Sequence, residues 1–488
     1  MAIGVAIIQG LVMVPLYLQF IPVNIYSFWL ATGNILAWMS AIDPGLTVVL
    51  QQQIAVAYGK KDFTKVKNLI GGGLLFSAIV FVMVIIIGLI AAKYLPVWLN
   101  VTSKSDNGLI VEAFSLAVLG TALMIFSFGL AAINAGLQGS ILVLVINNLV
   151  AIGSILVTYY LLHSGLGLMA LPLSIVFSGV CYSLFQGIYL FVRVYNERIG
   201  VTFSFIGMLE LGKLLSYTFA SRMLTTVANN IDLVVVANIL GPVSVAVLAL
   251  TRKSCDLSKE LINQPIVAFQ PAVSHAVGTG DIKKLGEVLT RLVHILTWLL
   301  FLVVGGIINF NEAFVYLWVG ADFFAGSIVN LAICIAFIFV MMFTCLSNLC
   351  FSLGDVKVTS AVAGLQALLF IPLVIFGAQY FGILGAVCAS IVSPLLVSIF
   401  YFNRKFKKLL NLSTENTIEM SKQVFLCVMT VFLITYIFSF FKYESWLEFI
   451  LFVATYIFVY LALLFSLSAS LRRETRNIWN FLPGLRNL

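Results

Sequence analysis

The sequence predicts an all-α polytopic membrane protein with 14 transmembrane helices. Of its 488 residues, 62% are hydrophobic and only 9% are charged, whereas soluble proteins carry about 25% charged residues. So few charges cannot cover the core of a chain this long. The composition therefore excludes a soluble enzyme, a nucleic-acid binder and a disordered scaffold. The apolar residues form long unbroken runs, whereas the strands of a membrane β-barrel alternate over short segments.

Hydropathy divides the chain into runs long enough to cross a bilayer, which takes about 20 apolar residues for each helix. The predicted spans are residues 2–20, 28–51, 69–92, 110–131, 143–162, 166–192, 216–240, 243–267, 288–308, 326–348, 358–378, 382–402, 423–441 and 446–469. Very short connections at 163–165, 241–242 and 379–381 predict that the spans on either side are antiparallel hairpins.

The basic residues outside these spans lie almost entirely on one side of the membrane. Those that share a side are Lys60, Lys61, Lys65, Lys67, Arg193, Arg198, Lys213, Lys283, Lys284, Lys357, Arg404, Lys405, Lys407, Lys408, Lys422, Arg472, Arg473, Arg476 and Arg486. The opposite loops hold only Lys93, Lys104 and Lys442. Because Lys and Arg accumulate in cytoplasmic loops, the first side and both chain termini are predicted to be cytoplasmic. The basic loops also suit anionic head groups, so membrane lipid is an expected partner and nucleic acid is not.

Two loops share a sequence pattern that indicates an internal repeat. Residues 59–66 and 278–285 both fit Gly-x-x-Asp-apolar-x-Lys-apolar, and they follow the second and the eighth predicted spans. A displacement of six spans preserves orientation, so the pattern predicts two six-helix lobes in a pseudo-twofold repeat plus two C-terminal helices. The predicted domains are 1–200, 201–410, and 411–488 with the last two spans and a basic tail. Secondary transporters with such repeats bind substrate between the halves.

Charged residues at membrane depth are concentrated in the neighbouring spans 216–240 and 243–267. Charges at this depth are costly and usually functional. The cations are Arg222, Arg252, Lys253 and Lys259; the acids are Asp232, Asp256 and Glu260; the amides include Asn229 and Asn263. At about 100° per residue, Arg252, Asp256, Lys259 and Asn263 share one helix sector. We interpret these residues as the lining of a polar translocation cavity. A self-neutralising ladder of ion pairs is the alternative, since Arg252 and Asp256 are i,i+4.

The first half of the chain holds fewer polar candidates. Asp43 precedes Pro44 in the second span, where proline removes a backbone donor and predicts a helix break. Asp43 either serves the cavity, caps this break or pairs with a distant cation. The amides Asn134, Gln138, Asn147 and Asn148 could line a cavity, although hydrogen bonds between helices are their commoner use. The run Gly71-Gly72-Gly73 predicts close helix packing and not phosphate binding, since no Walker pattern follows it.

No catalytic or cofactor-binding pattern occurs in the sequence. There is no nucleotide-binding motif, no catalytic triad pattern and no metal-ligand spacing among the three histidines. We therefore expect no catalytic residue, no metal and no bound cofactor, and no ATPase on the same chain. Coupling to H+ or Na+ through one of the acids, Asp43, Asp232, Asp256 or Glu260, remains open.

The sequence resembles the multidrug/oligosaccharidyl-lipid/polysaccharide exporter superfamily, within it the polysaccharide transporter branch of Wzx-type flippases for O-antigen and capsule repeat units. The resemblance covers most of the first 12 predicted spans. It rests on residues 28–30, 43–46 and 55–67 in the first half, and on residues 229–232, 239–242, 270–274 and 280–281 in the second.

The resemblance implies the V-shaped two-lobe fold of the MATE transporters. The cavity would move an undecaprenyl-diphosphate-linked oligosaccharide across the bacterial inner membrane, from cytoplasm to periplasm, for O-antigen, capsule or exopolysaccharide synthesis. The four buried cations would bind the diphosphate, and the acids would balance them. The protein would be a monomeric secondary transporter and not an enzyme. A polysaccharide polymerase and a chain-length regulator would be its partners.

Alternative functions within the superfamily are a multidrug/cation antiporter and a lipid II flippase. Asp43 is the only charge deep in the first two spans, which disfavours a lipid II flippase because a basic first lobe is expected of one. Outside transport, the alternatives are a membrane-embedded glycan polymerase and a scaffold. A polymerase needs large periplasmic loops or catalytic residues, and the buried charges disfavour a scaffold.

Overall fold

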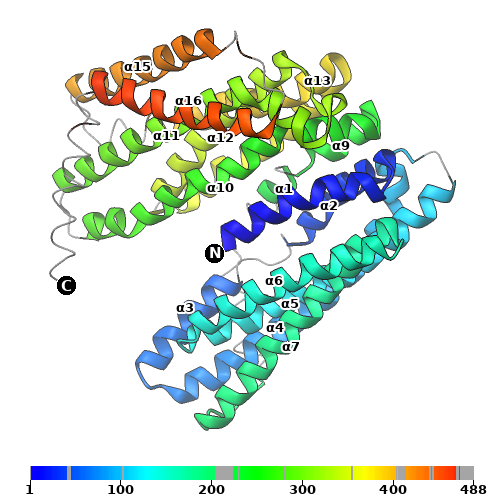
Figure 1. The fold of residues 1–488 in the computed structure, drawn as a ribbon. Helices are drawn as coiled ribbons and strands as arrows, with labels where there is room; N and C mark the ends of the chain where they lie inside the picture. Colours follow the sequence, from blue (N-terminus) through cyan, green and yellow to red (C-terminus); the bar gives the residue numbers. More distant parts are fainter. Residues whose placement is uncertain are drawn as a thin grey trace. The chain divides into compact units, whose positions relative to one another are not determined.

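A computed structural model describes residues 2–40, 46–101, 104–203, 224–228, 230–278, 282–352, 356–402, 404, 414–438, 441, 445–468 and 472. Every regular element in these ranges is helical (Figure 1). The α-helices are α1 (Ala2–Phe20), α2 (Val23–Ser40), α3 (Leu46–Gly59), α4 (Phe63–Trp98), α5 (Lys104–Gly136), α6 (Ser140–His163), α7 (Ala170–Asn196), α9 (Asp232–Leu240), α10 (Pro242–Gly278), α11 (Ile282–Val319), α12 (Ser327–Ser352), α13 (Val356–Leu396), α15 (Thr414–Phe438) and α16 (Trp446–Leu467). Two 3-10 helices, η1 (Gly167–Met169) and η2 (Ala321–Phe323), connect them.

Nine helices of the described ranges are long and apolar enough to cross a membrane. They carry large apolar side chains on their outer surfaces, such as Phe191 on α7 and Phe458 on α16, which are 72% and 74% exposed. A water-soluble bundle would turn polar residues outward instead. The prediction of an all-α polytopic membrane protein is therefore confirmed, while the number of crossings stays a prediction.

The helices differ from the predicted spans at two places. Span 28–51 corresponds to α2 and α3, and the segment between them, with Asp43, lies outside the described residues. Spans 358–378 and 382–402 lie in α13 and the residues after it. Gly382, with φ of 63°, interrupts the helix at the start of the second span. Several helices also run past the apolar core, as α11 does with 38 residues. A span predicted from hydropathy ends at the first charged residues, whereas a helix continues through Lys, Glu and Arg, which are good helix formers.

The chain forms two compact units. The first comprises Met1–Ala246 with Ala363–Gln379, and the second comprises Val247–Val362 with Tyr380–Leu488.

In the first unit, α5 is the central helix and packs against α2, α3, α4, α6 and α7. Its backbone approaches that of α7 closely, because a Cβ on Gly120 would lie 2.6 Å from the Val176 amide nitrogen and one on Gly179 would lie 2.6 Å from the Gly120 carbonyl oxygen. The glycine run in α4 also serves packing, as predicted. A Cβ on Gly71 would overlap the Thr202 carbonyl, and the Thr202 N–H donates to the Lys67 carbonyl at 3.3 Å.

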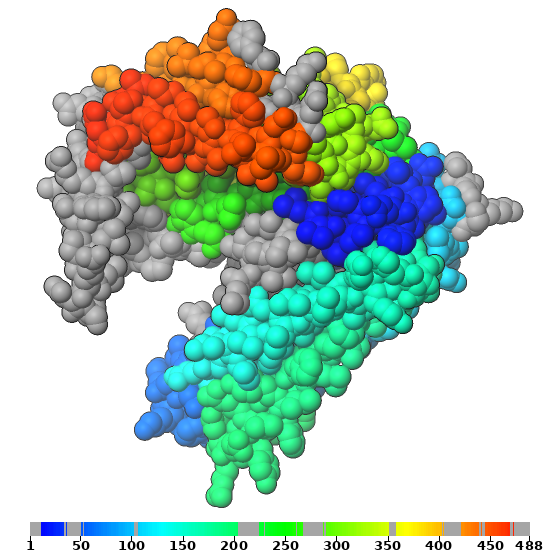
Figure 2. All heavy atoms as spheres, in the orientation of Figure 1, coloured from blue at the N-terminus to red at the C-terminus, as the bar shows by residue number. Residues whose placement is uncertain are grey.

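In the second unit, α11 is the central helix and packs against α12, α15 and α16. The side chains of α15 and α16 lie side by side (Figure 2). The hydroxyls of Tyr456 and Tyr460 on α16 donate to the carbonyls of Leu302 and Trp298 on α11, at 2.8 and 3.0 Å. These bonds and a buried aromatic cluster around Phe310 hold the two C-terminal helices onto α11.

Candidate functional site

The candidate site lies on α10, which starts at a sharp turn. Gly241 follows the last residue of α9 with a φ of 86°, a left-handed conformation that glycine adopts without strain. Pro242 is the first residue of α10, where its fixed φ suits a helix start and its missing N–H leaves no bond unmade. The predicted Gly-Pro turn is therefore confirmed. From here α10 continues without a break to Gly278.

Four of the predicted site residues share one face of α10. Arg252, Asp256, Lys259 and Asn263 fall within a sector of about 60°, because the helix is continuous through all of them. The Arg252 Nε lies 3.4 Å from the Asp256 Oδ2, and the two side chains are 28% and 51% exposed. Charge-assisted hydrogen bonds are shorter, about 2.7–2.9 Å. This ion pair is loose, and its carboxylate is open to other groups.

The other two residues of this face complete its chemistry. The Lys259 side chain is half-buried, as is that of Lys253, which lies outside the sector. The Asn263 Oδ1 is buried, and within the described residues it accepts no hydrogen bond. The α10 face, defined here as Arg252, Asp256, Lys259 and Asn263, thus presents two cations, one carboxylate and an amide oxygen. Such a set can bind a phosphate through the cations and hydroxyl groups through the carboxylate and the amide.

Asp232 belongs to the first unit and has a local structural role. It is the first residue of α9, is 8% exposed, and its Oδ1 accepts the Leu233 N–H at 2.9 Å. A carboxylate in the first turn also interacts favourably with the helix dipole. Arg222, Asn229 and Asp43 lie outside the described residues, as does the side chain of Glu260. Their predicted roles stay predictions.

A buried polar cluster fixes the opposite side of α10, and the sequence analysis missed it. The Asn311 Nδ2 on α11 donates to the Thr251 carbonyl and to the Asn330 Oδ1, both at 2.8 Å, and the Ser254 hydroxyl donates to the Asn311 Oδ1 at 2.7 Å. The Thr251 hydroxyl donates to the Phe323 carbonyl at 3.1 Å. Thr251, Asn311 and Asn330 are 0%, 2% and 4% exposed. We call Thr251, Ser254, Asn311 and Asn330 the polar knot.

The polar knot fixes the rotation of α10 about its own axis and thereby the direction in which the α10 face points. Thr251 and Ser254 flank Arg252 in sequence, so bonds to α11, α12 and the η2 loop fix the rotation of α10 at this level. Hydropathy placed Asn311 in a loop because the predicted span ended at residue 308, whereas α11 continues to Val319. The repeated asparagines at 309 and 311 were the available signal for a polar contact.

The amides of the first unit pair with one another. Asn134, which is fully buried, donates through Nδ2 to the carbonyl and the Oε1 of Gln186, at 3.0 and 2.9 Å. The Gln186 Nε2 lies 3.5 Å from the Asn147 Oδ1 on α6. The Asn148 Nδ2 donates to the Leu144 carbonyl of its own helix. Asn134, Gln186 and Asn147 thus join α5, α6 and α7. Hydrogen bonding between helices is the commoner of the two uses considered for the amides.

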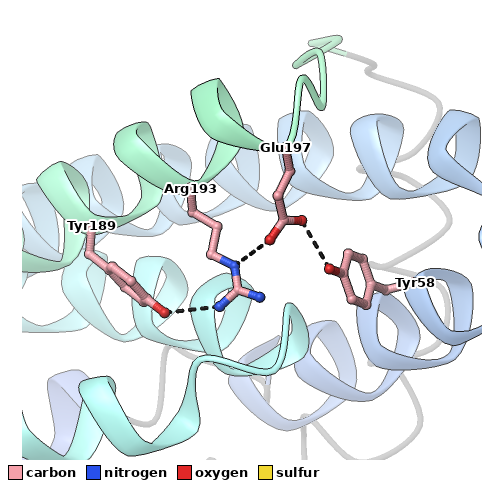
Figure 3. A network of polar contacts seen from close by, with 4 residues as sticks. All are labelled: Tyr58, Tyr189, Arg193 and Glu197. Carbon is pink, nitrogen blue, oxygen red and sulfur yellow. Dashed lines mark hydrogen bonds and ion pairs between the residues drawn. The ribbon is translucent and has the colours of Figure 1, made fainter.

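A second arginine–carboxylate pair lies at the ends of α3 and α7 (Figure 3). The Arg193 Nε donates to the Glu197 Oε1 at 2.7 Å, and its Nη1 donates to the Tyr189 hydroxyl at 3.0 Å. The Tyr58 hydroxyl on α3 donates to the Glu197 Oε2 at 3.0 Å. Both charged groups of this pair are therefore committed to bonds within the protein.

Solved structures of transporters share the fold of the chain. No family model and no curated protein matches the sequence. A lipid II flippase, MurJ, in an inward closed conformation aligns with a TM-score of 0.71 and 14% identity, covering 95% of this chain and 97% of its own. The chain has the fold of MurJ and of the MATE transporters. An inward-facing MATE-family multidrug resistance transporter of the MOP superfamily aligns with a TM-score of 0.69, 15% identity and coverage of 82% and 94%. Its outward-facing counterpart aligns with a TM-score of 0.61, 15% identity and coverage of 84% and 94%.

Proposed function

We propose that the protein is a flippase that moves undecaprenyl-diphosphate-linked oligosaccharide repeat units to the outer leaflet of the bacterial inner membrane, by alternating access. The α10 face is the observation that carries this proposal. It places Arg252 and Lys259 on one sector of a helix in the second unit, whose helices α11, α12, α15 and α16 are long and apolar enough to cross a membrane, and charges in such surroundings usually serve a function. A diphosphate is the part of such a lipid that needs cations, and arginine binds phosphate bidentately.

The sugars explain why the site also needs neutral and acidic acceptors. Moving one unsatisfied hydroxyl into hydrocarbon costs about 4–8 kcal/mol on a cyclohexane scale. Asp256, which is half-exposed, and the buried Asn263 Oδ1 provide acceptors for hydroxyl groups on the same face. Asp256 also provides a carboxylate at which H+ or Na+ could couple to transport. The proposed cycle therefore uses one helix face for both parts of the head group.

A lipid II flippase is the second candidate. MurJ covers 95% of this chain, whereas the two MATE transporter structures compared above cover 82% and 84%. This coverage favours a lipid-linked diphosphate over the substrates of a multidrug transporter. Both flippase candidates require the same cationic face, so sugar composition is what distinguishes them.

Transport by the purified protein in proteoliposomes tests the proposal. We expect wild-type protein to flip a fluorescent polyprenyl-diphosphate oligosaccharide and to leave a lipophilic cation dye in place. The combined variant Arg252→Gln, Lys253→Gln, Lys259→Gln should lose at least about tenfold in rate, since one charge-assisted bond is worth 1.5–3 kcal/mol. Lys422→Gln, at an exposed lysine of α15, is the matched control and should transport normally.

Two outcomes contradict the proposal. Transport of the cation dye but not of the lipid-linked sugar would identify an antiporter. Normal flipping by the triple variant would show that the α10 face does not bind the diphosphate. Flipping of lipid II at a rate equal to or above that of an O-antigen repeat unit would favour the second candidate.

A further inference from the structure

We propose that the ends of α3 and α7 form a binding surface for the phosphate head groups of anionic phospholipids. The surface consists of Lys60, Lys61, Lys65 and Arg198, and we call it the basic end. Lys60 and Lys61 follow α3, Arg198 follows α7, and all four side chains are exposed. The hydrogen bond from Tyr58 to Glu197 holds the two helix ends together (Figure 3).

The acids near the basic end are already engaged. Asp62 caps α4, because its Oδ1 accepts the Lys65 backbone N–H at 3.0 Å. Glu197 accepts hydrogen bonds from Arg193 and Tyr58. Across the described part of the chain, no ion pair joins a carboxylate to any of the four cations. Asp62 keeps its negative charge while it caps the helix and offsets one of the four cations, so the basic end stays net positive toward groups outside the protein.

Two of these cations occupy positions that normally favour glycine. Helices α3 and α7 end in the same motif, in which the N–H groups of Asp62 and Ile199 donate to the carbonyls of Ala57 and Val194. The residue before each donor is left-handed, namely Lys61 with φ of 57° and Arg198 with φ of 52°. Glycine is the usual residue there because a Cβ is strained. Glycine would fit both positions without strain, so Lys61 and Arg198 can each be replaced by glycine without weakening the fold.

The surroundings of the basic end indicate a lipid surface. Phe63 begins α4 and is 48% exposed, and Tyr195, in the last turn of α7, is 75% exposed. Aromatic side chains gather where a membrane meets water, at the level of the head groups. Exposed aromatic side chains beside exposed cations match an anionic phospholipid, which has both a charged head group and acyl chains, better than a soluble phosphate.

Glycine substitutions at the left-handed positions give a test that does not weaken the fold. The double variant Lys61→Gly, Arg198→Gly removes two charges and relieves two strained residues. Asn100 and Gln138 are the matched controls, because they are left-handed (φ of 52° and 68°) at the ends of α4 and α5 in the same motif. Asn100→Gly, Gln138→Gly therefore gives the same relief without removing charge.

The measurement is the thermal unfolding of the full chain in detergent micelles titrated with lipid. We expect phosphatidylglycerol, but not phosphatidylcholine, to raise the unfolding temperature of the wild type. In the absence of lipid, both double variants should have a higher unfolding temperature than the wild type. The Lys61/Arg198 variant should then need about 25-fold more phosphatidylglycerol for the half-maximal shift, at about fivefold for each basic residue, while the Asn100/Gln138 variant responds as the wild type does.

Three results would overturn the proposal. The first is an equal response of the two variants to phosphatidylglycerol. The second is an equal effect of phosphatidylcholine on the wild type. The third is a shift produced by a polyprenyl diphosphate but not by phosphatidylglycerol, which would assign the basic end to the transported lipid. All three are independent of the α10 face, so they do not depend on the proposed transport function.

Discussion

Two arginine–carboxylate pairs have the same i,i+4 spacing but different surroundings. The Arg193 Nε and the Glu197 Oε1 are 2.7 Å apart, Tyr189 binds a second nitrogen of Arg193, and Tyr58 binds the second oxygen of Glu197. Arg252 and Asp256 are 3.4 Å apart, and Asp256 is half-exposed. The first pair holds helix ends together, whereas the second is held in place by a polar knot on the other side of its helix. Spacing alone therefore does not separate a structural pair from a candidate binding pair.

The largest expected effect comes from breaking the polar knot. Asn311→Ala removes the partner of the Ser254 hydroxyl, the Thr251 carbonyl and the Asn330 Oδ1. We expect the free energy of unfolding in micelles to fall by about 2–4 kcal/mol, because each buried unpaired group costs about 1–3 kcal/mol. Transport should fall with it as α10 loses its orientation. Asn148→Ala, whose side chain bonds only within α6, should change stability by less than about 0.5 kcal/mol.

Removing either arginine should separate stability from transport. Arg193→Ala leaves Glu197 without its charged partner, and we expect the free energy of unfolding to fall by about 1–2 kcal/mol. Arg252→Ala should lower it less than Arg193→Ala does, because the ion pair with Asp256 is longer and its carboxylate is half-exposed, and it should abolish transport of the lipid-linked sugar. Chemical unfolding and the proteoliposome assay, run on the same preparations, measure both. Equal stability losses in the two variants would show that the pairs are not different in kind.

Replacing arginine by lysine sharpens the comparison. Lysine keeps the charge but cannot serve two partners in the geometry of a guanidinium. Arg193→Lys should therefore lower the free energy of unfolding by about 1 kcal/mol, because Arg193 binds Glu197 and Tyr189 through separate nitrogens. Arg252→Lys should lower the transport rate several-fold, because lysine keeps the charge but loses the bidentate contact with phosphate. An unchanged transport rate in Arg252→Lys would indicate that the substrate needs only the charge.

The smallest expected effect comes from a single hydroxyl. Tyr58→Phe removes the donor to the Glu197 Oε2 and should lower the free energy of unfolding by about 0.5 kcal/mol, as hydrogen bonds in membrane proteins average about 0.6 kcal/mol. A double-mutant cycle with Glu197→Gln should recover this coupling. Tyr160→Phe, at a side chain that is 70% exposed, serves as the reference and should show no change.

The candidate site was only partly predictable from the sequence. The 3.6-residue period placed Arg252, Asp256, Lys259 and Asn263 on one face, and this needed only that α10 be continuous. The same reasoning gave no sign that Glu197 is engaged by Tyr58, because the two residues lie 139 positions apart in the sequence. It also assigned Asn311 to a loop, because hydropathy measures apolar character and does not detect a helix that continues into polar residues.

The sequence by itself determined the fold class and the location of most apolar helical segments, because both follow from the local density and period of apolar residues. It also determined that charge is concentrated in α10. Only the tertiary structure decided which way α10 faces and that Tyr58 binds Glu197 at the end of α7. Both depend on hydrogen bonds between helices far apart in sequence, whose partners become neighbours only when the helices pack.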